Sequence, residues 1–142
     1  MAQVRVEVLP WEQAEPLAAP LRFAAFFDDS RSGIELDAQD PQCMHAIAYD
    51  ESGKPIGTGR LLPDGVIAPF AVVKEWRRRG VVAPALLEAL LAEAAKRGLA
   101  GVTVSAPLQA AEFYREQGFI ADGKVFKEAG MLQQRMRKPL GA

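Results

Sequence analysis

One stretch of the chain, residues 84–98, carries apolar residues at helical spacing, and the neighbouring segments can be placed around it. Its apolar positions are Leu86, Leu87, Leu90, Leu91 and Ala94, and charged residues occupy the opposite face. This is the pattern of an amphipathic helix, and Gly98 is a typical helix end. An apolar run at residues 71–73 and a basic turn at residues 74–80 come before it. We therefore predict a buried strand, a loop and a helix, in this order.

The basic turn is a candidate anion-binding site. It gathers four cationic side chains ahead of Gly80. The first N–H groups of a helix have no partner within the helix, and the helix dipole adds partial positive charge at the same end. A strand followed by such a turn and a helix is therefore an arrangement that holds phosphate groups.

The remaining elements are shorter. Period-two alternation and turn residues predict strands at residues 4–9, 44–49, 55–62, 66–73 and 101–105, another that begins at Phe119, and a closing strand at 131–137. Helices are expected at residues 11–27, interrupted or restarted by Pro16 and Pro20, and at 109–117. Hairpin-linked strands followed by strand–helix–strand–helix–strand predict a mixed α/β sheet rather than a doubly wound one. We expect the closing strand to lie at an edge.

Composition narrows the class of protein. The 142 residues, 49% hydrophobic and 25% charged, suit one domain over residues 1–142. A net charge of −1 argues against nucleic acid as a partner. No apolar run approaches the roughly 20 residues that a membrane-spanning helix needs, so no membrane partner is expected. The N-terminus lacks the layout of a secretory signal, and a lone cysteine, Cys43, suits a reducing compartment. We therefore expect a cytoplasmic protein.

Two motifs carry a family resemblance. Residues 77–82 (RRRGVV) resemble the Arg/Gln-x-x-Gly-x-Gly/Ala signature with which the GNAT superfamily of N-acetyltransferases binds the pyrophosphate of acetyl-CoA. Residues 110–119 (AAEFYREQGF) resemble that superfamily's second segment, in which a Phe-Tyr pair precedes Gly-Phe. Short glycine-containing motifs have many false matches, but these two occur together, in order, and one helix and one strand apart. Residues 35–40, His45, 57–61 and 126–131 also look similar to the small bacterial ElaA-like branch.

The resemblance implies the GNAT acyl-CoA N-acyltransferase fold, with a mostly antiparallel central sheet and flanking helices. It implies acetyl-CoA as a co-substrate and no metal. The main chains of Val72 and Val73 would contact the pantetheine arm. The phosphates would be held by Arg77, Arg78, Arg79, Gly80, Val81, Val82 and Ala83, with Lys74 nearby, while Phe113 and Tyr114 would contribute from the second motif.

The same resemblance suggests catalytic and acceptor-binding residues. Tyr114 matches the tyrosine proposed to protonate the departing CoA thiolate, a role that needs a hydroxyl within hydrogen-bond reach of the sulfur. Glu35, Asp37 and Glu128 are candidates for the general base, although any one of them could be an ordinary surface carboxylate, and a base acting through water is an alternative. Glu35, Asp37 and His45 would border the acceptor site, where the acidic residues suit a cationic amine. His45 alone does not make a metal site.

The resulting prediction is an N-acetyltransferase that moves acetyl from acetyl-CoA to a primary amine by direct attack in a ternary complex. The alternative is a GNAT-like domain that binds CoA or a protein partner without catalysis, since the sequence departs from the expected pattern at Val82, Pro69 and Gln133. A homodimer is a further expectation, because an apolar edge strand at residues 131–136 would need covering.

Overall fold

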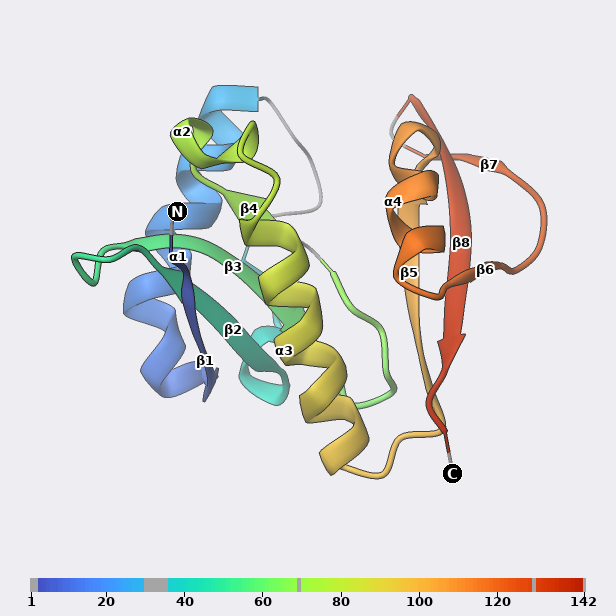
Figure 1. Ribbon diagram of the computed structural model, residues 1–142, viewed down its shortest axis with the longest axis horizontal. Helices are drawn as coiled ribbons and strands as arrows, with labels where there is room; N and C mark the ends of the chain where they lie inside the picture. The colour runs from blue at the N-terminus through green and yellow to red at the C-terminus, as the bar shows by residue number, and fades with distance from the viewer. Residues whose placement is uncertain (1–2, 30–35, 69, 129, 142) are drawn as a thin grey trace.

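The strands form two antiparallel sheets that lie side by side (Figure 1). The computed structural model describes residues 3–29, 36–68, 70–128 and 130–141. The first sheet has the order β1-β2-β3-β4 and consists of β1 (Arg5–Pro10), β2 (Met44–Tyr49), β3 (Pro55–Leu61) and β4 (Ala71–Val72). The second has the order β5-β8-β6, with β7 also paired to β8, and consists of β5 (Gly101–Pro107), β6 (Ile120–Ala121), β7 (Phe126–Glu128) and β8 (Met131–Pro139). The predicted mixed α/β architecture is confirmed.

Among the described residues, one isolated β-bridge connects the two sheets, ahead of β4. Val66 and Thr103 form an isolated parallel bridge, in which the Ile67 N–H donates to the Thr103 carbonyl (2.9 Å) and the Thr103 N–H donates to the Gly65 carbonyl (3.0 Å). Beyond this bridge the two segments of the chain run in the same direction, but β4 pairs with β3, and β5 pairs with β8. In the described part of the chain no ladder connects β4 to β5. The facing edges of these strands therefore separate towards their C-terminal ends.

Helices cover both faces of the first sheet. The predicted amphipathic helix is α3 (Val82–Lys96), and its residues Leu86, Leu87 and Leu90 are fully buried against β1, β2 and β3. A Cβ atom at Gly57 of β3 would lie 2.7 Å from Cγ1 of Val82, so the absence of a side chain lets α3 approach the sheet closely. The opposite face is covered by α1 (Trp11–Asp29), which is continuous through both of its prolines. No helix among the described residues is long and apolar enough to cross a membrane.

Three segments differ from the prediction. The basic turn begins as a short helix, α2 (Lys74–Arg77), since residues 74–77 contain neither glycine nor proline. The strand expected at residues 66–73 is reduced to β4, with isolated bridges before it. The helix expected at residues 109–117 is a 3₁₀ turn, η2 (Leu108–Ala110), followed by α4 (Ala111–Glu116).

The prediction that the closing strand lies at an edge is wrong. β8 pairs with β5 on one side and with β6 and β7 on the other. The chain between residues 119 and 128 returns along β8 as two short strands, and these supply the hydrogen bonds that an edge would have left open. The apolar edge that suggested a homodimer is therefore covered within the chain itself.

Candidate active site

The end of β4 presents main-chain polar groups to the space between the two sheets. Val73 lies opposite Ile56 and donates its N–H to the Ile56 carbonyl (2.9 Å). In an antiparallel pair, hydrogen-bonded and non-hydrogen-bonded positions alternate. Val72, which lies opposite Gly57, therefore turns its N–H and C=O away from β3 and towards the side on which β5 lies. This is an open strand edge at the point where the sheets separate.

Val72 and Val73 differ in how their main-chain N–H and C=O groups are hydrogen-bonded. The Val73 N–H is used in the sheet, and its carbonyl accepts the N–H of Trp76 (3.0 Å) as α2 begins. The Val72 carbonyl accepts a hydrogen bond from Nε of Arg77 (2.9 Å). This bond ties the first arginine of the motif to the end of β4, so the strand edge and the basic turn form one unit.

The side chains of the basic turn are held to different degrees. Arg77 bonds to β4, and the guanidinium carbon of Arg79 lies 4.2 Å from the centre of the Trp76 ring. Lys74 and Arg78 are exposed, and their side chains make no hydrogen bond or ion pair with the described residues. In the described part of the chain, the turn thus combines two cations that make side-chain contacts with two whose side chains are exposed to solvent.

The N-terminus of α3 is open to an anion. Gly80 has φ of +68°, which favours glycine, and a Cβ atom there would meet nothing within 4 Å. The N-cap residue, Val81, has an apolar side chain and makes no capping hydrogen bond to the first N–H groups of α3. The Val82 side chain is only 1% exposed and packs in the core, facing β3. A β-branched residue at this motif position therefore adds its bulk on the inner side of the helix and not on the side where a phosphate would lie.

The second motif places its aromatic pair on α4, against the second sheet. Tyr114 is 9% exposed and lies edge-on to the rings of Phe113 (5.1 Å between centroids) and Phe119 (5.4 Å). Tyr114 belongs to the same core cluster against which Val72, Trp76 and Phe113 pack. Both motifs therefore contribute to one continuous core, and α4 follows β5 at the end where β5 has parted from β4.

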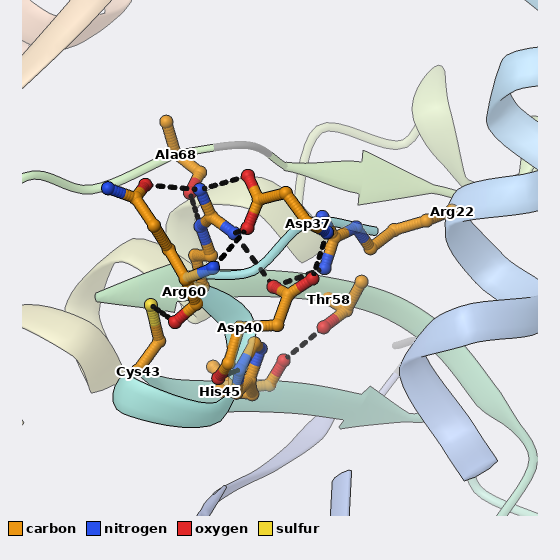
Figure 2. A network of polar contacts seen from close by, with 10 residues as sticks. Arg22, Asp37, Asp40, Cys43, His45, Thr58, Arg60 and Ala68 are labelled. Atoms are coloured by element: carbon orange, nitrogen blue, oxygen red, sulfur yellow. Dashed lines mark hydrogen bonds and ion pairs between the residues drawn. The ribbon is translucent and has the colours of Figure 1, made fainter. Parts of the chain in front are cut away.

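The acidic segment after α1 is bound by arginines of the chain itself (Figure 2). Asp40 is fully buried, and its Oδ1 accepts from Nη1 of Arg22 (2.8 Å) and Nη1 of Arg60 (2.7 Å). The Asp37 carboxylate accepts two hydrogen bonds from Arg60, from Nη1 to Oδ1 (2.8 Å) and from Nη2 to Oδ2 (3.1 Å). The Asp37 N–H donates to the other oxygen of Asp40 (2.8 Å), and Nε of Arg60 donates to the Ala68 carbonyl (2.9 Å). Two carboxylates and two guanidinium groups thus form a balanced, mostly buried cluster.

This cluster changes the interpretation of the acidic residues. Asp37 was expected to suit a cationic acceptor, but its charge and that of Asp40 are matched by Arg60 and Arg22. Glu35 lies outside the described residues. Arg60 lies within residues 57–61, which look similar to the ElaA-like branch, but neither Arg60 nor Arg22 was predicted as a partner of these carboxylates. One signal was present: Arg60 follows buried positions on a strand, and a buried arginine needs a carboxylate.

The cluster also sets the protonation states of its carboxyl groups. The hydrogen bonds from Arg60 are the main cause that lowers the pKa of Asp37 below its usual value. Burial opposes ionisation of Asp40, but the hydrogen bonds from Arg22, the Asp37 N–H and Arg60 outweigh it, so the pKa of Asp40 is lowered as well. Both carboxyl groups are ionised at neutral pH, and a lowered pKa makes Asp37 a weaker base.

His45 is packed inside the protein, next to this cluster. It is 1% exposed, its ring lies 4.7 Å from the Trp11 ring, and it lies opposite Arg60 in the sheet. Its Nε2 is 3.0 Å from the Asp40 carbonyl oxygen, which can only accept, so Nε2 carries the hydrogen. Burial lowers the pKa of His45 below 6.5. The imidazole is therefore neutral at neutral pH and supports the turn that holds Asp40.

The lowered pKa of His45 predicts how stability depends on pH. His45 takes up a proton at a higher pH in the unfolded chain than in the folded protein. Its contribution to the free energy of unfolding is therefore fully present above about pH 6.5 and is lost as the pH falls below that value. Urea unfolding between about pH 8 and about pH 5 should show a decline of at most about 1.4 kcal/mol per pH unit, the limit for one proton. His45→Gln, which keeps a donor for the Asp40 carbonyl, should flatten the decline. An equally steep decline in both proteins would assign it to other groups.

The remaining predicted residues lie on the second sheet. Glu128 is exposed at the end of β7, and its side chain makes no hydrogen bond or ion pair with the described residues. Gln133 lies on β8, opposite Pro107 on one side and Phe126 on the other. Pro69 lies outside the described residues. Among the residues that the structure describes, no group of three His, Cys, Asp or Glu side chains could hold a metal ion.

Comparisons with known proteins point to one family. A family model described as an acetyltransferase (GNAT) domain matches residues 23–140. A search of curated proteins found no match. Among solved structures, a proposed N-acetyltransferase from Lactobacillus plantarum is 26% identical, with a TM-score of 0.84, and the match covers 96% of this chain and 98% of that one.

Two further crystal structures share the fold. An acyl-CoA N-acyltransferase from Pseudomonas aeruginosa is 21% identical, and ElaA from Escherichia coli is 19% identical. Each has a TM-score of 0.81, and each match covers 96% of this chain and 99% of the other. The GNAT fold and the likeness to ElaA, both predicted from the sequence, are confirmed. Because the family model spans most of the sequence, the chain belongs to the GNAT acetyltransferase family.

Proposed function

We propose that this protein transfers an acetyl group from acetyl-CoA to a primary amine, by direct attack within a ternary complex. One observation carries the proposal: the open edge at Val72 leads straight into the basic turn and the uncapped N-terminus of α3. A pantetheine arm contains amide groups that can pair with a free strand edge. Its pyrophosphate needs N–H donors and cations at the end of that arm. The two features occur here in the order that such a molecule requires.

The phosphates would be held mainly by the main chain. Gly80, Val81, Val82 and Ala83 would offer N–H groups, while the cationic side chains supply charge from Arg77, Arg78 and Arg79. Proline at position 84 has no N–H to offer, but it lies within the first turn of α3, where that donor has no partner in the helix in any case. The inward direction of the Val82 side chain supports this assignment.

The proposed reaction forms a bond between the amine nitrogen and the acetyl carbon and breaks the bond between that carbon and the CoA sulfur. The Tyr114 hydroxyl would donate a proton to the departing thiolate. The amine loses a proton to a base, and the tyrosine regains one from the solvent, so protons balance over the cycle. The ring contacts with Phe113 and Phe119 would hold Tyr114 in place.

Of the two candidates for the general base that lie among the described residues, Asp37 and Glu128, the better one is Glu128. Arg60 lowers the pKa of Asp37, which reduces its ability to take a proton from an ammonium group. Glu128 is exposed and makes no ion pair with the described residues. In this proposal Asp37 and the buried His45 shape the acceptor side of the site, and Glu128 or a water molecule takes the proton. Glu35 remains a candidate for acceptor binding from the sequence alone.

Calorimetric titration with acetyl-CoA tests the proposal. The wild-type protein should bind, and the Arg79→Glu, Gly80→Asp double variant should bind at least about tenfold more weakly, since two added carboxylates and one lost cation oppose the phosphates. A matched control is Arg137→Glu, Gly123→Asp, which makes the same changes of charge at an exposed arginine of β8 and at another open glycine with positive φ.

The control should keep wild-type affinity. Equal losses in both double variants would show that net charge, and not this turn, governs binding. Absence of binding by the wild-type protein would contradict the proposed function. Binding without turnover across a panel of primary amines would favour a domain that holds CoA without catalysis.

A further inference from the structure

We propose that Trp76 is a positioning residue, whose indole ring holds the Arg79 guanidinium where it meets a phosphate of the acyl-CoA. The inference rests on the proposed function and goes one step beyond it. The motif assigns the arginine to the phosphates but says nothing of what orients it. In this chain the orienting group would be an aromatic ring three residues earlier.

The ring and the arginine are joined in two ways. The guanidinium carbon of Arg79 lies 4.2 Å from the centre of the Trp76 ring, within the range of a cation–π contact. The Arg79 N–H also donates to the Trp76 carbonyl (3.2 Å), which closes the turn between them. Trp76 is half-buried and packs against the main core cluster, whereas Arg79 is exposed. The ring is therefore the fixed partner, and it restricts the arginine.

The other cations of the turn are placed differently. Arg77 bonds through Nε to the Val72 carbonyl, so part of its donor capacity is already used. The side chains of Lys74 and Arg78 make no hydrogen bond, ion pair or ring contact with the described residues. Arg79 combines an orienting contact with donors that no described residue occupies, because stacking uses the face of the guanidinium and leaves its N–H groups at the edge.

This arrangement is suited to binding a phosphate. An exposed arginine loses rotamer freedom when it binds a ligand, and that loss weakens affinity. A side chain already restricted by a ring loses less at the moment of binding. Guanidinium groups can give paired N–H donors to phosphate oxygens, which requires a defined orientation. The Trp76 ring would supply that orientation before the ligand arrives.

A double-mutant cycle measured by CoA calorimetry tests the inference. Trp76→Leu keeps a smaller apolar side chain against the core but removes the ring, and should weaken CoA binding about fivefold. Arg79→Ala should weaken it about tenfold, the loss expected for a charge-assisted contact. The double variant Trp76→Leu, Arg79→Ala should bind no more weakly than Arg79→Ala alone, because the ring acts through the arginine. Trp76→Phe keeps a ring face and should stay within about twofold of wild type.

The comparison cycle uses Arg78, which the ring does not contact. Losses from Trp76→Leu and Arg78→Ala should add, and a general loosening of the turn would instead couple Trp76 equally to both arginines. Thermal denaturation of each variant establishes that it is folded. Additive losses of CoA affinity for Trp76→Leu and Arg79→Ala would overturn the inference, as would a Trp76→Phe variant that binds CoA as weakly as Trp76→Leu. Neither result would contradict the proposed function. A wild-type protein that binds no CoA would overturn both this inference and the proposed function.

Discussion

Replacement of Asp40 by alanine is expected to destabilise the protein by about 3 to 5 kcal/mol, the cost of removing one partner from a buried ion pair. Asp40 is fully buried, and the Arg22 side chain is 3% exposed, so the two guanidinium groups bonded to Asp40 cannot turn to water without disturbing α1 or β3. The Asp37 N–H would lose its acceptor as well. Urea unfolding monitored by circular dichroism measures the loss.

Two other substitutions serve as comparisons for the loss of stability expected from Asp40→Ala. Asp37→Ala should cost clearly less, because its side chain is 46% exposed and Arg60 keeps Asp40 as a partner. Asp122→Ala, at an exposed carboxylate without a side-chain contact to the described residues, should stay within about 0.5 kcal/mol of wild type. If Asp40→Ala cost no more than Asp122→Ala, the buried cluster would not be what fixes residues 37–40 to the sheet.

Replacement of Tyr114 by phenylalanine is expected to lower turnover about 100-fold, the smaller end of what a general acid contributes. The variant keeps the ring that packs against Phe113 and Phe119, so any loss of stability should not exceed about 1.5 kcal/mol, the value of one hydrogen bond. Affinity for acetyl-CoA should change little. The measurements are kcat with an amine found by screening and calorimetry with acetyl-CoA.

The chain offers a matched control in its other tyrosine. Tyr49 is 7% exposed, packs in the cluster beneath α1, and belongs to the first sheet. Tyr49→Phe removes the same atom from a similarly buried ring, and turnover should be unchanged. Unchanged turnover in Tyr114→Phe would remove Tyr114 from the mechanism, and equal decreases in both variants would point to a general effect of losing a buried hydroxyl.

Much of the fold follows from local patterns. The helix predicted from the leucine spacing is present as α3, and Gly98 lies just beyond its end with φ of +75°. The alternating segments became β1, β2, β3 and β5 at nearly the predicted bounds. These elements were predictable because burial of one face imposes a period of 3.6 or 2 residues on the sequence. The shortening of the strand predicted at residues 66–73 could not be predicted in this way, because the break between β4 and β5 depends on pairing between distant segments.

Two further features could not be predicted from local patterns, namely the direction of the Val82 side chain and the pairing of β8. The direction of the Val82 side chain is a consequence of how closely α3 approaches Gly57, and no local pattern contains it. Similarly, β8 pairs on both sides only because residues 119–128 return along it. At both positions local patterns predict the correct element but not the segment that packs or pairs beside it.

By itself the sequence determined the order of the elements, the GNAT family, and the position of the basic turn between a strand and a helix. Each depends on residues near one another in the chain, where spacing and glycine conformation carry the information. Only the tertiary structure decided that Asp37 and Asp40 bind Arg60 and Arg22, residues about twenty positions away. A carboxylate has the same charge whether it faces solvent or a guanidinium, so its role depends on which partner the fold brings within hydrogen-bond distance.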